Sequence, residues 1–518
     1  MSKESMFPKN DALKGLNPTV FLGIIVFLGA ALRIYNLGTE SYWIDEMSTV
    51  IEGQQSIFQI ITSGRLDQPP AYYFPFHLWL QMFGLSEVST RLFSTLVGVG
   101  SIVLVYLVGQ ELFGREVGLF AGFLMAISEF QIYYSQQARF YTFFQFATLL
   151  SFVFFIRVLG GKRKTDFALY VGASVLMIYS HAYGLFVIAA QGLFLILQWK
   201  KYRDVIVIWF VCQVVVFLAI IPYFYPLILG GSGLGGAVGE NIGGLSVPLL
   251  RDPVRSVYRF VMSARGERSW ETILINYAMA AVLFVSGVWI YAVKRGWSNL
   301  LDSARNWFAN LQEVQDVKGK LLLVSCWLLC PILLPFIFSF IIGPMYLDRY
   351  TISAAPALYL ILGWALFSIR KIVPAIISLS VIVVMIAPSL GYYYETDVHE
   401  QWKEAALYIE ENANPDDVIV FAPNLGIGIQ QKTFNWYYQD TLQECSLGVE
   451  LVDSTLITDT LMECVATHDR FWVIIRDNQT EPSHRYTSYF LNPDQTDMRL
   501  IEERHFVEIS VYLFERSK

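Results

Sequence analysis

DVIVIWFVCQVVVFLAIIPYFY, residues 204–225, contains no charged residue after Asp204. A membrane-spanning helix needs about 20 mostly apolar residues, and this stretch is long enough. Similar stretches recur along the chain, which is 55% hydrophobic and only 16% charged. A soluble globular protein carries about 25% charged residues. The sequence therefore predicts an α-helical protein that crosses a membrane many times.

About 11 spans are predicted, and short or adjoining stretches leave this number open by one or two. They lie at residues 18–37, 92–113, 117–132, 140–159, 166–182, 184–199, 204–225, 272–292, 320–342, 350–369 and 372–392. Lys and Arg accumulate in short cytoplasmic loops. Here the basic pairs Lys200–Lys201 and Arg370–Lys371 each follow an even-numbered span. The N-terminus is therefore expected in the cytoplasm and the C-terminus outside it.

The chain becomes less apolar near residue 393, where turn signals and charged residues appear. An amphipathic helix is predicted at Trp402–Glu410. Three strand-like stretches follow it, at Val418–Phe421, Phe471–Arg476 and Phe506–Phe514. We therefore expect a transmembrane domain over 1–392 and a small extracytoplasmic α/β domain over 393–518. The net charge of −7 gives no reason to expect a nucleic-acid partner.

The last two of the five cysteines, Cys445 and Cys464, lie in this C-terminal domain. If the domain is extracytoplasmic, the two could form a disulfide, although the sequence does not give their separation. The other three cysteines lie in apolar stretches, where a thiol packs as a small apolar group.

An acidic pair, Asp45 and Glu46, follows the first span by a few residues, in the predicted outside loop 38–91. An isolated acidic pair is most often solvated. Here Tyr42 and Trp43 precede it, which favours partial burial. Burial raises the pKa of a carboxyl group and suits base or metal chemistry.

Three more polar clusters are predicted at the same membrane face, and they contain Arg139, His181 and Arg349. Each arginine could simply extend its charged end to the membrane surface, but a guanidinium also suits two-point binding of a phosphate. A single histidine is usually a packing residue. Taken together, two acids, two arginines and a histidine suit a site that holds an anionic lipid head group while a nucleophile loses its proton.

A further arginine-rich stretch, 251–268, is also predicted outside. Its arginines are Arg251, Arg255, Arg259, Arg265 and Arg268. An amphipathic helix on the membrane surface, with Tyr258 among the residues facing the lipid, or contact with anionic lipid would explain it.

Four segments occur in an order that resembles a known group of enzymes: Trp43–Glu46, Gln68–Tyr73, Tyr134–Tyr141 and Asp348–Tyr350. Tyr179–His181 is similar to another segment of that group. The chain resembles the polytopic glycosyltransferases of the GT-C fold, specifically the protein O-mannosyltransferase and aminoarabinose-transferase-like group (glycosyltransferase family 39 and relatives).

The resemblance implies transfer of a sugar from a polyprenyl-phosphate-linked donor to a lipid, glycan or protein acceptor. It implies that Asp45 is the catalytic base and that Glu46 binds the acceptor or a metal. Arg139 and Arg349 match positions suited to the donor phosphate. Further candidate substrate-binding residues in these segments are Tyr72, Tyr73, Tyr134, Gln137, Tyr350 and His181. No cofactor is certain, and a divalent metal held by Glu46 and His181 is left open.

Two residues depart from the group. Glu129 stands where many members have proline, and Gln68 stands where some relatives have a lysine beside the double proline. The second departure leaves aminoarabinose unsupported as the donor sugar. A transporter or flippase of the same lipid is the alternative; it predicts internal repeats and charges near the membrane midplane. A non-catalytic scaffold is a second alternative, and it leaves the acidic and arginine clusters unexplained.

Overall fold

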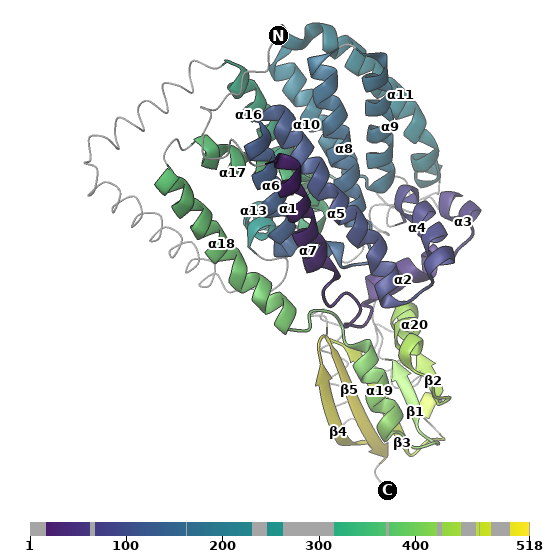
Figure 1. Cartoon of the computed structure of the whole chain (residues 1–518). Coiled ribbons are helices and arrows are strands. Elements are labelled where there is room, and N and C mark those ends of the chain that lie inside the picture. Colours follow the sequence, from purple (N-terminus) through teal and green to yellow (C-terminus); the bar gives the residue numbers. More distant parts are fainter. Residues whose placement is uncertain are drawn as a thin grey trace. The chain divides into compact units, whose positions relative to one another are not determined.

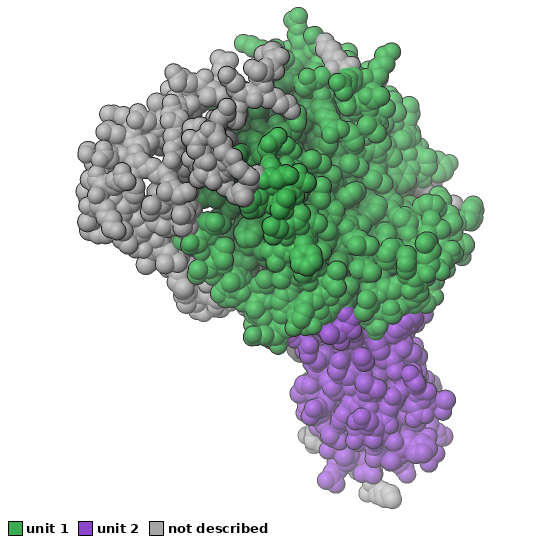
Figure 2. Space-filling view, viewed as in Figure 1, with its two compact units in different colours: residues 1–37, 52–395 green, residues 38–51, 396–518 purple. Residues whose placement is uncertain are grey.

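The computed structural model describes residues 17–62, 68–161, 163–229, 246–262, 315–368, 372–421, 427–446, 463–465, 467–477 and 498–516 (Figure 1). The chain forms two compact units (Figure 2). The first contains residues 1–37 and 52–395, and the second contains residues 38–51 and 396–518. The segment 38–51, which carries the acidic pair, therefore groups with the C-terminal residues.

The first unit is a bundle of helices (Figure 1). Its helices are α1 (Pro18–Ile34), α3 (Ile57–Thr62), α4 (Pro70–Phe83), α5 (Glu87–Leu112), α6 (Arg115–Ile127), α7 (Glu129–Ser135), α8 (Tyr141–Gly160), α9 (Lys164–Ser180), α10 (Gly184–Leu197), α11 (Trp199–Leu229), α13 (Asp252–Val261), α16 (Gln315–Ile341), η2 (Asp348–Ala354), α17 (Ala355–Ser368) and α18 (Ile372–Glu395). Helix α2 (Ile44–Gly53) begins in the second unit and ends in the first.

Within the described ranges, five helices are long and apolar enough to cross a membrane: α5, α8, α11, α16 and η2 with α17. A sixth span results if α6 and α7, which meet at 62°, are counted together. Helices α1, α10 and part of α18 are apolar but shorter. The chain is an integral membrane protein, as predicted. The number of about 11 spans stays a prediction, and the predicted span 272–292 lies outside the described residues.

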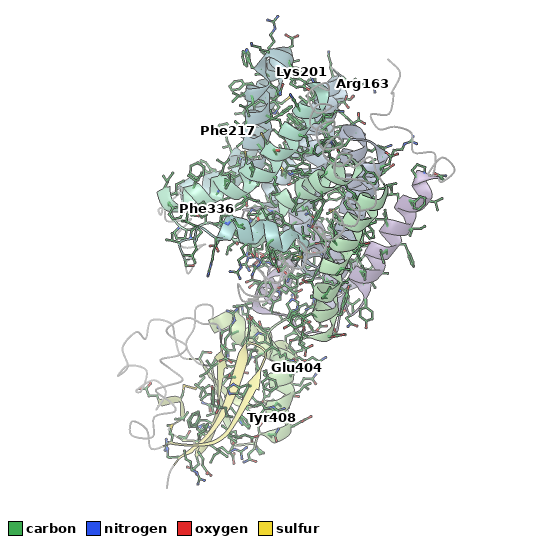
Figure 3. The ribbon with its side chains drawn as sticks, turned by 90° about the vertical axis from the view of Figure 1, so that its left-hand side faces the viewer. Arg163, Lys201, Phe217, Phe336, Glu404 and Tyr408 are labelled. Carbon is green, nitrogen blue, oxygen red and sulfur yellow. A yellow bond between two sulfur atoms is a disulfide. The ribbon has the colours of Figure 1, made fainter. Side chains whose placement is uncertain are left out.

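Close packing joins the central helices. Helix α5 contacts α6 and α8, and α8 contacts α9. A Cβ atom added at Gly109 would lie 2.6 Å from the Cα of Gly118, so α5 and α6 approach too closely there for any side chain. Small residues allow such contacts between membrane helices. On the outside of the bundle, Phe217 of α11 is 63% exposed, as suits a side chain facing lipid (Figure 3).

Helix α13 forms where the arginine-rich stretch predicted an amphipathic helix, and Arg265 and Arg268 lie outside the described residues. The predicted orientation is wrong for Tyr258, which is buried rather than lipid-facing. The cause is packing within the unit. Ser256 bonds to Tyr346 at 2.6 Å, and the hydroxyl of Tyr359 donates to the carbonyl of Phe260 at 2.6 Å. Helix α13 is thus fixed on one side to the rest of the helical unit.

The second unit contains a five-stranded mixed sheet of order β2-β1-β3-β5-β4. Its strands are β1 (Val418–Phe421), β2 (Gln443–Ser446), β3 (Arg470–Arg476), β4 (Met498–Phe506) and β5 (Ile509–Arg516), and its helices are α19 (Trp402–Asn412) and α20 (Ile427–Tyr437). Strand β1 pairs in parallel with β2 and β3, whereas β5 pairs antiparallel with β3 and β4. Helices α19 and α20 pack against the sheet (Figure 1).

The predicted helix and the first two strands are confirmed, but the third predicted strand, Phe506–Phe514, is wrong at its start. Phe506 ends β4, and the chain turns at Glu508 with φ of 57° before β5. The sequence did not indicate β2 or β4, because β2 is short and β4 is mostly exposed and charged. Cys445 and Cys464 form a disulfide, with Cα atoms 6.1 Å apart, within the usual range for such bonds.

Candidate active site

The candidate site and the basic loop that contains Arg163 lie at opposite ends of helix α8. The helix has 20 residues and is therefore about 30 Å long. Tyr141 begins it, and Arg157 lies in its last turn. Arg163 and Lys201 lie at one end of the helices (Figure 3), and Arg163 follows the end of α8 in sequence. The segments around Tyr141 therefore lie at the opposite end of α8 from this basic loop.

The break between α6 and α7 is held by Arg33 of α1, which is fully buried. Its guanidinium donates to the carbonyl oxygens of Met125 at 2.8 Å and Ala126 at 3.0 Å, in the last turn of α6. It also donates to Ser135 Oγ, at the end of α7, at 3.1 Å. The last four carbonyl groups of a helix have no partner within it, so a buried cation stabilises this helix end. Arg33 thus fixes the start of the loop that leads to Arg139.

A chain of hydrogen bonds fixes that loop from a second side. The hydroxyl of Tyr72, on α4, bonds to Ser94 Oγ at 3.2 Å, and Ser94 Oγ donates to the backbone carbonyl of Arg139 at 3.2 Å. The Tyr72 ring is buried and stacks on Phe76. Tyr72 was predicted to bind substrate; in the structure its hydroxyl supports the backbone of Arg139.

Arg139 and Arg349 come from distant parts of the chain and approach one aromatic ring. The guanidinium carbon of Arg139 lies 5.7 Å from the centre of the Tyr141 ring, and that of Arg349 lies 5.9 Å from it. Both distances are within the range of cation–π contacts. Two guanidinium groups near one buried tyrosine make its surroundings positive, which favours the binding of an anion there.

The hydroxyl of Tyr141 is buried and has no hydrogen-bond partner among the residues that the structure describes. Buried polar groups are almost always hydrogen-bonded, and an exception suggests a missing ligand, ion or water. A phenol can donate to an anionic oxygen. The two arginines and this hydroxyl therefore form a set of donors suited to a phosphate. We call Arg139, Tyr141 and Arg349 the anion cluster.

The short helix η2 positions Arg349. Asp348 precedes it and forms an ion pair with Arg259 of α13. The backbone carbonyl of Asp348 accepts a hydrogen bond from the side-chain hydroxyl of Thr351 at 2.6 Å, and the side chain of Gln145 on α8 donates to the carbonyl of Ile352 at 3.0 Å. Arg349 is therefore held by a tightened turn that is attached to both α13 and α8.

His181 lies in the loop between α9 and α10, and its side chain packs beside Phe140 and Tyr350, with ring centres 5.5 and 4.6 Å away. Its Nδ1 accepts the backbone N–H of Tyr183 at 3.1 Å, so the proton of the neutral ring is on Nε2. Burial, and then the positive charges of Arg139 and Arg349, lower the pKa of His181 to about 3. His181 is therefore a neutral neighbour of the anion cluster.

His181 does not fit the role of a metal ligand. A metal-binding histidine usually donates its second ring nitrogen to an acceptor, whereas here that nitrogen accepts from the backbone. Within the described ranges, there is no group of three or more His, Cys, Asp or Glu side chains that could hold a metal. Among the described residues, the surroundings of His181 therefore do not form a metal site.

The remaining predicted substrate-binding residues differ in their surroundings. Tyr134 lies on α7 with its ring 5.3 Å from that of Tyr141, and Tyr350 lies 6.2 Å from the same ring. Gln137 is buried in the loop before Arg139. Tyr73 points elsewhere, because its hydroxyl donates to Glu52 at 3.0 Å. The structure thus places Tyr134 and Tyr350 beside the anion cluster.

Asp45 and Glu46 occupy the first turn of α2, in the second unit. Glu46 is fully buried and Asp45 is partly buried. Tyr42 and Trp43 are both buried, so the expected burial around the acidic pair is confirmed. The backbone carbonyl of Asp45 accepts a hydrogen bond from the side-chain hydroxyl of Thr49, one turn later in the helix, at 3.0 Å.

The sequence assigns no role to Tyr141 or Arg33. Tyr141 ends the segment Tyr134–Tyr141, but nothing in the sequence shows that a tyrosine hydroxyl lacks a partner. Arg33 did carry a signal, because an arginine inside an apolar stretch is rare and usually has a specific partner. Glu129, the departure from the group pattern, is buried and accepts a hydrogen bond from Ser389.

Comparison with known proteins gives a partial match in sequence. Residues 67–225 match the family described as dolichyl-phosphate-mannose-protein mannosyltransferase. An uncharacterized protein of Aquifex aeolicus is 26% identical over 188 residues, which are 34% of this chain and 37% of the relative. The match thus spans little more than a third of that relative's length.

The fold matches over almost the whole chain. ArnT from Cupriavidus metallidurans, solved with undecaprenyl phosphate bound, is 12% identical, covers 96% of this chain and 98% of its own, and has a TM-score of 0.53. The oligosaccharyltransferase of Archaeoglobus fulgidus in its apo form is 13% identical, with coverage of 90% and 70% and a TM-score of 0.50. The resemblance seen in the motifs is thereby confirmed at the level of fold. The chain has the GT-C fold of the polytopic membrane glycosyltransferases.

Proposed function

We propose that this protein transfers a sugar from a polyprenyl-phosphate-linked donor to an acceptor at the extracytoplasmic face of the membrane. The observation that carries the proposal is the anion cluster, where Arg139 and Arg349 both lie within 6 Å of the Tyr141 ring and the Tyr141 hydroxyl is buried with no partner in the described part of the chain. Its donors suit the phosphate of a lipid-linked sugar.

The proposed reaction is a single displacement at the anomeric carbon. The bond between the acceptor oxygen and the anomeric carbon forms while the bond to the donor phosphate oxygen breaks. Asp45 takes the proton of the acceptor hydroxyl. Arg139 and Arg349 stabilise the negative charge that develops on the leaving phosphate. The role of Asp45 rests on its motif, and the role of the arginines rests on their geometry.

The second unit supports the extracytoplasmic part of the proposal. Its disulfide, Cys445–Cys464, is of a kind that persists in oxidising compartments and is rare in the cytoplasm. An extracytoplasmic second unit agrees with the orientation that the basic loops predict, in which the N-terminus is cytoplasmic.

The test is transfer by the purified chain in lipid vesicles, with a panel of radiolabelled polyprenyl-phosphate sugars and a membrane extract as the source of acceptor. Release of free polyprenyl phosphate together with labelled product supports the proposal. Movement of the intact donor across the vesicle membrane without release of polyprenyl phosphate would instead favour the flippase alternative.

A further inference from the structure

The acidic segment 38–51 is bonded to the C-terminal residues within the second unit. The side chain of Ser41 donates to the backbone carbonyl of Glu400 at 2.6 Å. The backbone N–H of Tyr42 donates to the hydroxyl of Tyr437, on α20, at 2.8 Å. The segment is therefore attached to two separate parts of the α/β fold before the acidic pair begins.

Glu400 makes the most direct connection. Its carboxylate is 1% exposed and accepts the backbone N–H of Ile44 at 3.2 Å. Ile44 is the first residue of α2, and the first N–H groups of a helix have no partner within it. A carboxylate at this end is also favoured by the helix dipole. Glu400 thus caps the helix that carries Asp45 and Glu46.

The side chain of Ile44 is fixed as well. It is 9% exposed and belongs to the apolar core formed by α19, α20 and one face of the sheet. Trp402 and Trp472 are members of the same core. Ile44 immediately precedes Asp45, so the position of the acidic pair follows from a residue whose backbone and side chain are both held by the α/β fold.

The surroundings of Glu400 leave it little freedom. One carboxylate oxygen accepts from Ile44 N and from the indole of Trp402 at 2.6 Å, and the other accepts from Arg476 at 2.8 and 2.6 Å. Every one of these neighbours is a donor. A carboxylate satisfies both sides, whereas an amide would turn its own N–H groups toward donors on one side.

We infer that Glu400, held by Arg476, is a positioning residue that sets the placement of Asp45 and Glu46, so that the C-terminal α/β fold is part of the catalytic machinery. This inference rests on the proposed function for its effect on turnover. The structural part of the inference, that the cap on Ile44 orders the acidic segment, does not depend on the proposed function.

A purely structural role for Glu400 is the competing explanation, and the chain supplies a matched control. Asp417 is 3% exposed and accepts from an arginine and an indole, Arg470 at 3.1 Å and Trp472 at 2.9 Å. It also accepts from the backbone N–H of Asn414, in its own turn, at 2.9 Å. Asp417 therefore has the same kind of partners as Glu400, without the hydrogen bond to Ile44.

The experiment compares Glu400→Gln and Asp417→Ala in the full chain, by hydrogen exchange, thermal unfolding and turnover. Both variants should lower the unfolding temperature. Only Glu400→Gln should speed exchange in residues 41–49, by about fivefold or more, the scale of losing one helix cap. It should also lower kcat by about tenfold to a hundredfold, as expected when a catalytic group is displaced, with the KM for the donor within about twofold of wild type.

A second variant keeps the test decisive if Glu400→Gln does not fold. Tyr437→Phe removes only the hydroxyl that accepts from Tyr42 N, and it should also speed exchange in residues 41–49 and lower kcat. Unchanged exchange in both variants, or equal loosening of residues 41–49 by Asp417→Ala, would overturn the inference. If wild-type protein transfers no sugar, the proposed function fails, while the exchange measurements still decide whether Glu400 orders the acidic segment.

Discussion

Arg139 and Arg349, 210 residues apart in sequence, lie 5.7 and 5.9 Å from the same ring, that of Tyr141. The two arginines are too far apart in sequence for the location of one to determine the location of the other. The pairing is produced by α8, which begins at Tyr141, and by η2, which is attached to α8 through Gln145. Two guanidinium groups near one buried phenol favour an anion at this place, and this arrangement is the basis of the first two predictions.

The first prediction concerns charge. Arg139→Ala should lower kcat/KM by about 10²–10³, the usual loss when one preorganised donor to a developing charge is removed. Arg139→Lys should recover part of the activity, because the charge remains but the planar fork of donors is lost. Arg251→Ala, at an exposed position before α13, is the control and should transfer normally. Near-normal transfer by Arg139→Ala would show that Arg139 only reaches toward the membrane surface.

The second prediction separates ligand binding from stability with two tyrosine variants. Tyr141→Phe removes a hydroxyl without a partner among the described residues, so it should weaken donor binding and leave the unfolding temperature unchanged or slightly raised. Tyr170→Phe removes a hydroxyl that bonds to Gln191, Trp209 and Gln213. It should lower stability and leave donor affinity unchanged. The reverse result would remove the main support for a phosphate at the anion cluster.

The third prediction concerns pH. Burial and the two arginines lower the pKa of His181 from about 6.5 in the unfolded chain to about 3 in the folded chain. Folding therefore opposes protonation of His181. The titration of His181 therefore does not affect the stability of the folded chain above about pH 6.5. As the pH falls from 6.5 toward 3, the unfolded chain takes up the proton first and the folded chain loses stability. At pH 5.5 the loss should be about 1 kcal/mol relative to pH 7.5.

The measurement is the unfolding temperature of wild type and His181→Asn at pH 7.5 and 5.5. Asparagine does not take up a proton, so the variant should lose less stability than wild type between these two values. His505→Asn is the control, because the side chain of His505 is 60% exposed. Equal losses in wild type and His181→Asn would show that His181 does not resist protonation in the folded chain.

The fourth prediction concerns topology. A reporter fused after residue 518 should be active only outside the cytoplasm, because the basic loops place the N-terminus inside. Non-reduced protein should yield a peptide pair linked through Cys445 and Cys464. Activity of the reporter in the cytoplasm would put the proposed site on the wrong side of the membrane.

The sequence was sufficient to predict the helical membrane fold and the α/β unit, because apolar length and the change of composition near residue 393 can be read directly from the chain. It could not show how the predicted site segments combine. Tyr72 and Tyr73 are adjacent, yet one supports the backbone of Arg139 through Ser94 and the other bonds to Glu52. Glu400 had no signal at all, because its role depends on Ile44, a residue more than 350 positions away.

The last prediction concerns the division of labour within the acidic pair. Asp45 and Glu46 are neighbours in the first turn of a helix, so their side chains point in directions about 100° apart. Glu46 is fully buried, whereas Asp45 is partly exposed. Of the two carboxylates, only that of Asp45 can therefore meet an acceptor hydroxyl without rearrangement. Asp45→Asn keeps the shape and hydrogen bonding of the side chain but cannot take up the proton.

Asp45→Asn should therefore abolish turnover while donor binding survives, because the proposed phosphate contacts come from Arg139 and Arg349. Glu46→Gln should reduce stability and turnover together, since it changes a buried group, and added divalent metal should not restore it. Transfer and donor binding are measured on both purified variants. If Glu46→Gln is inactive and Asp45→Asn turns over normally, the two roles are exchanged. If both variants transfer sugar at wild-type rates, α2 does not contain the catalytic base.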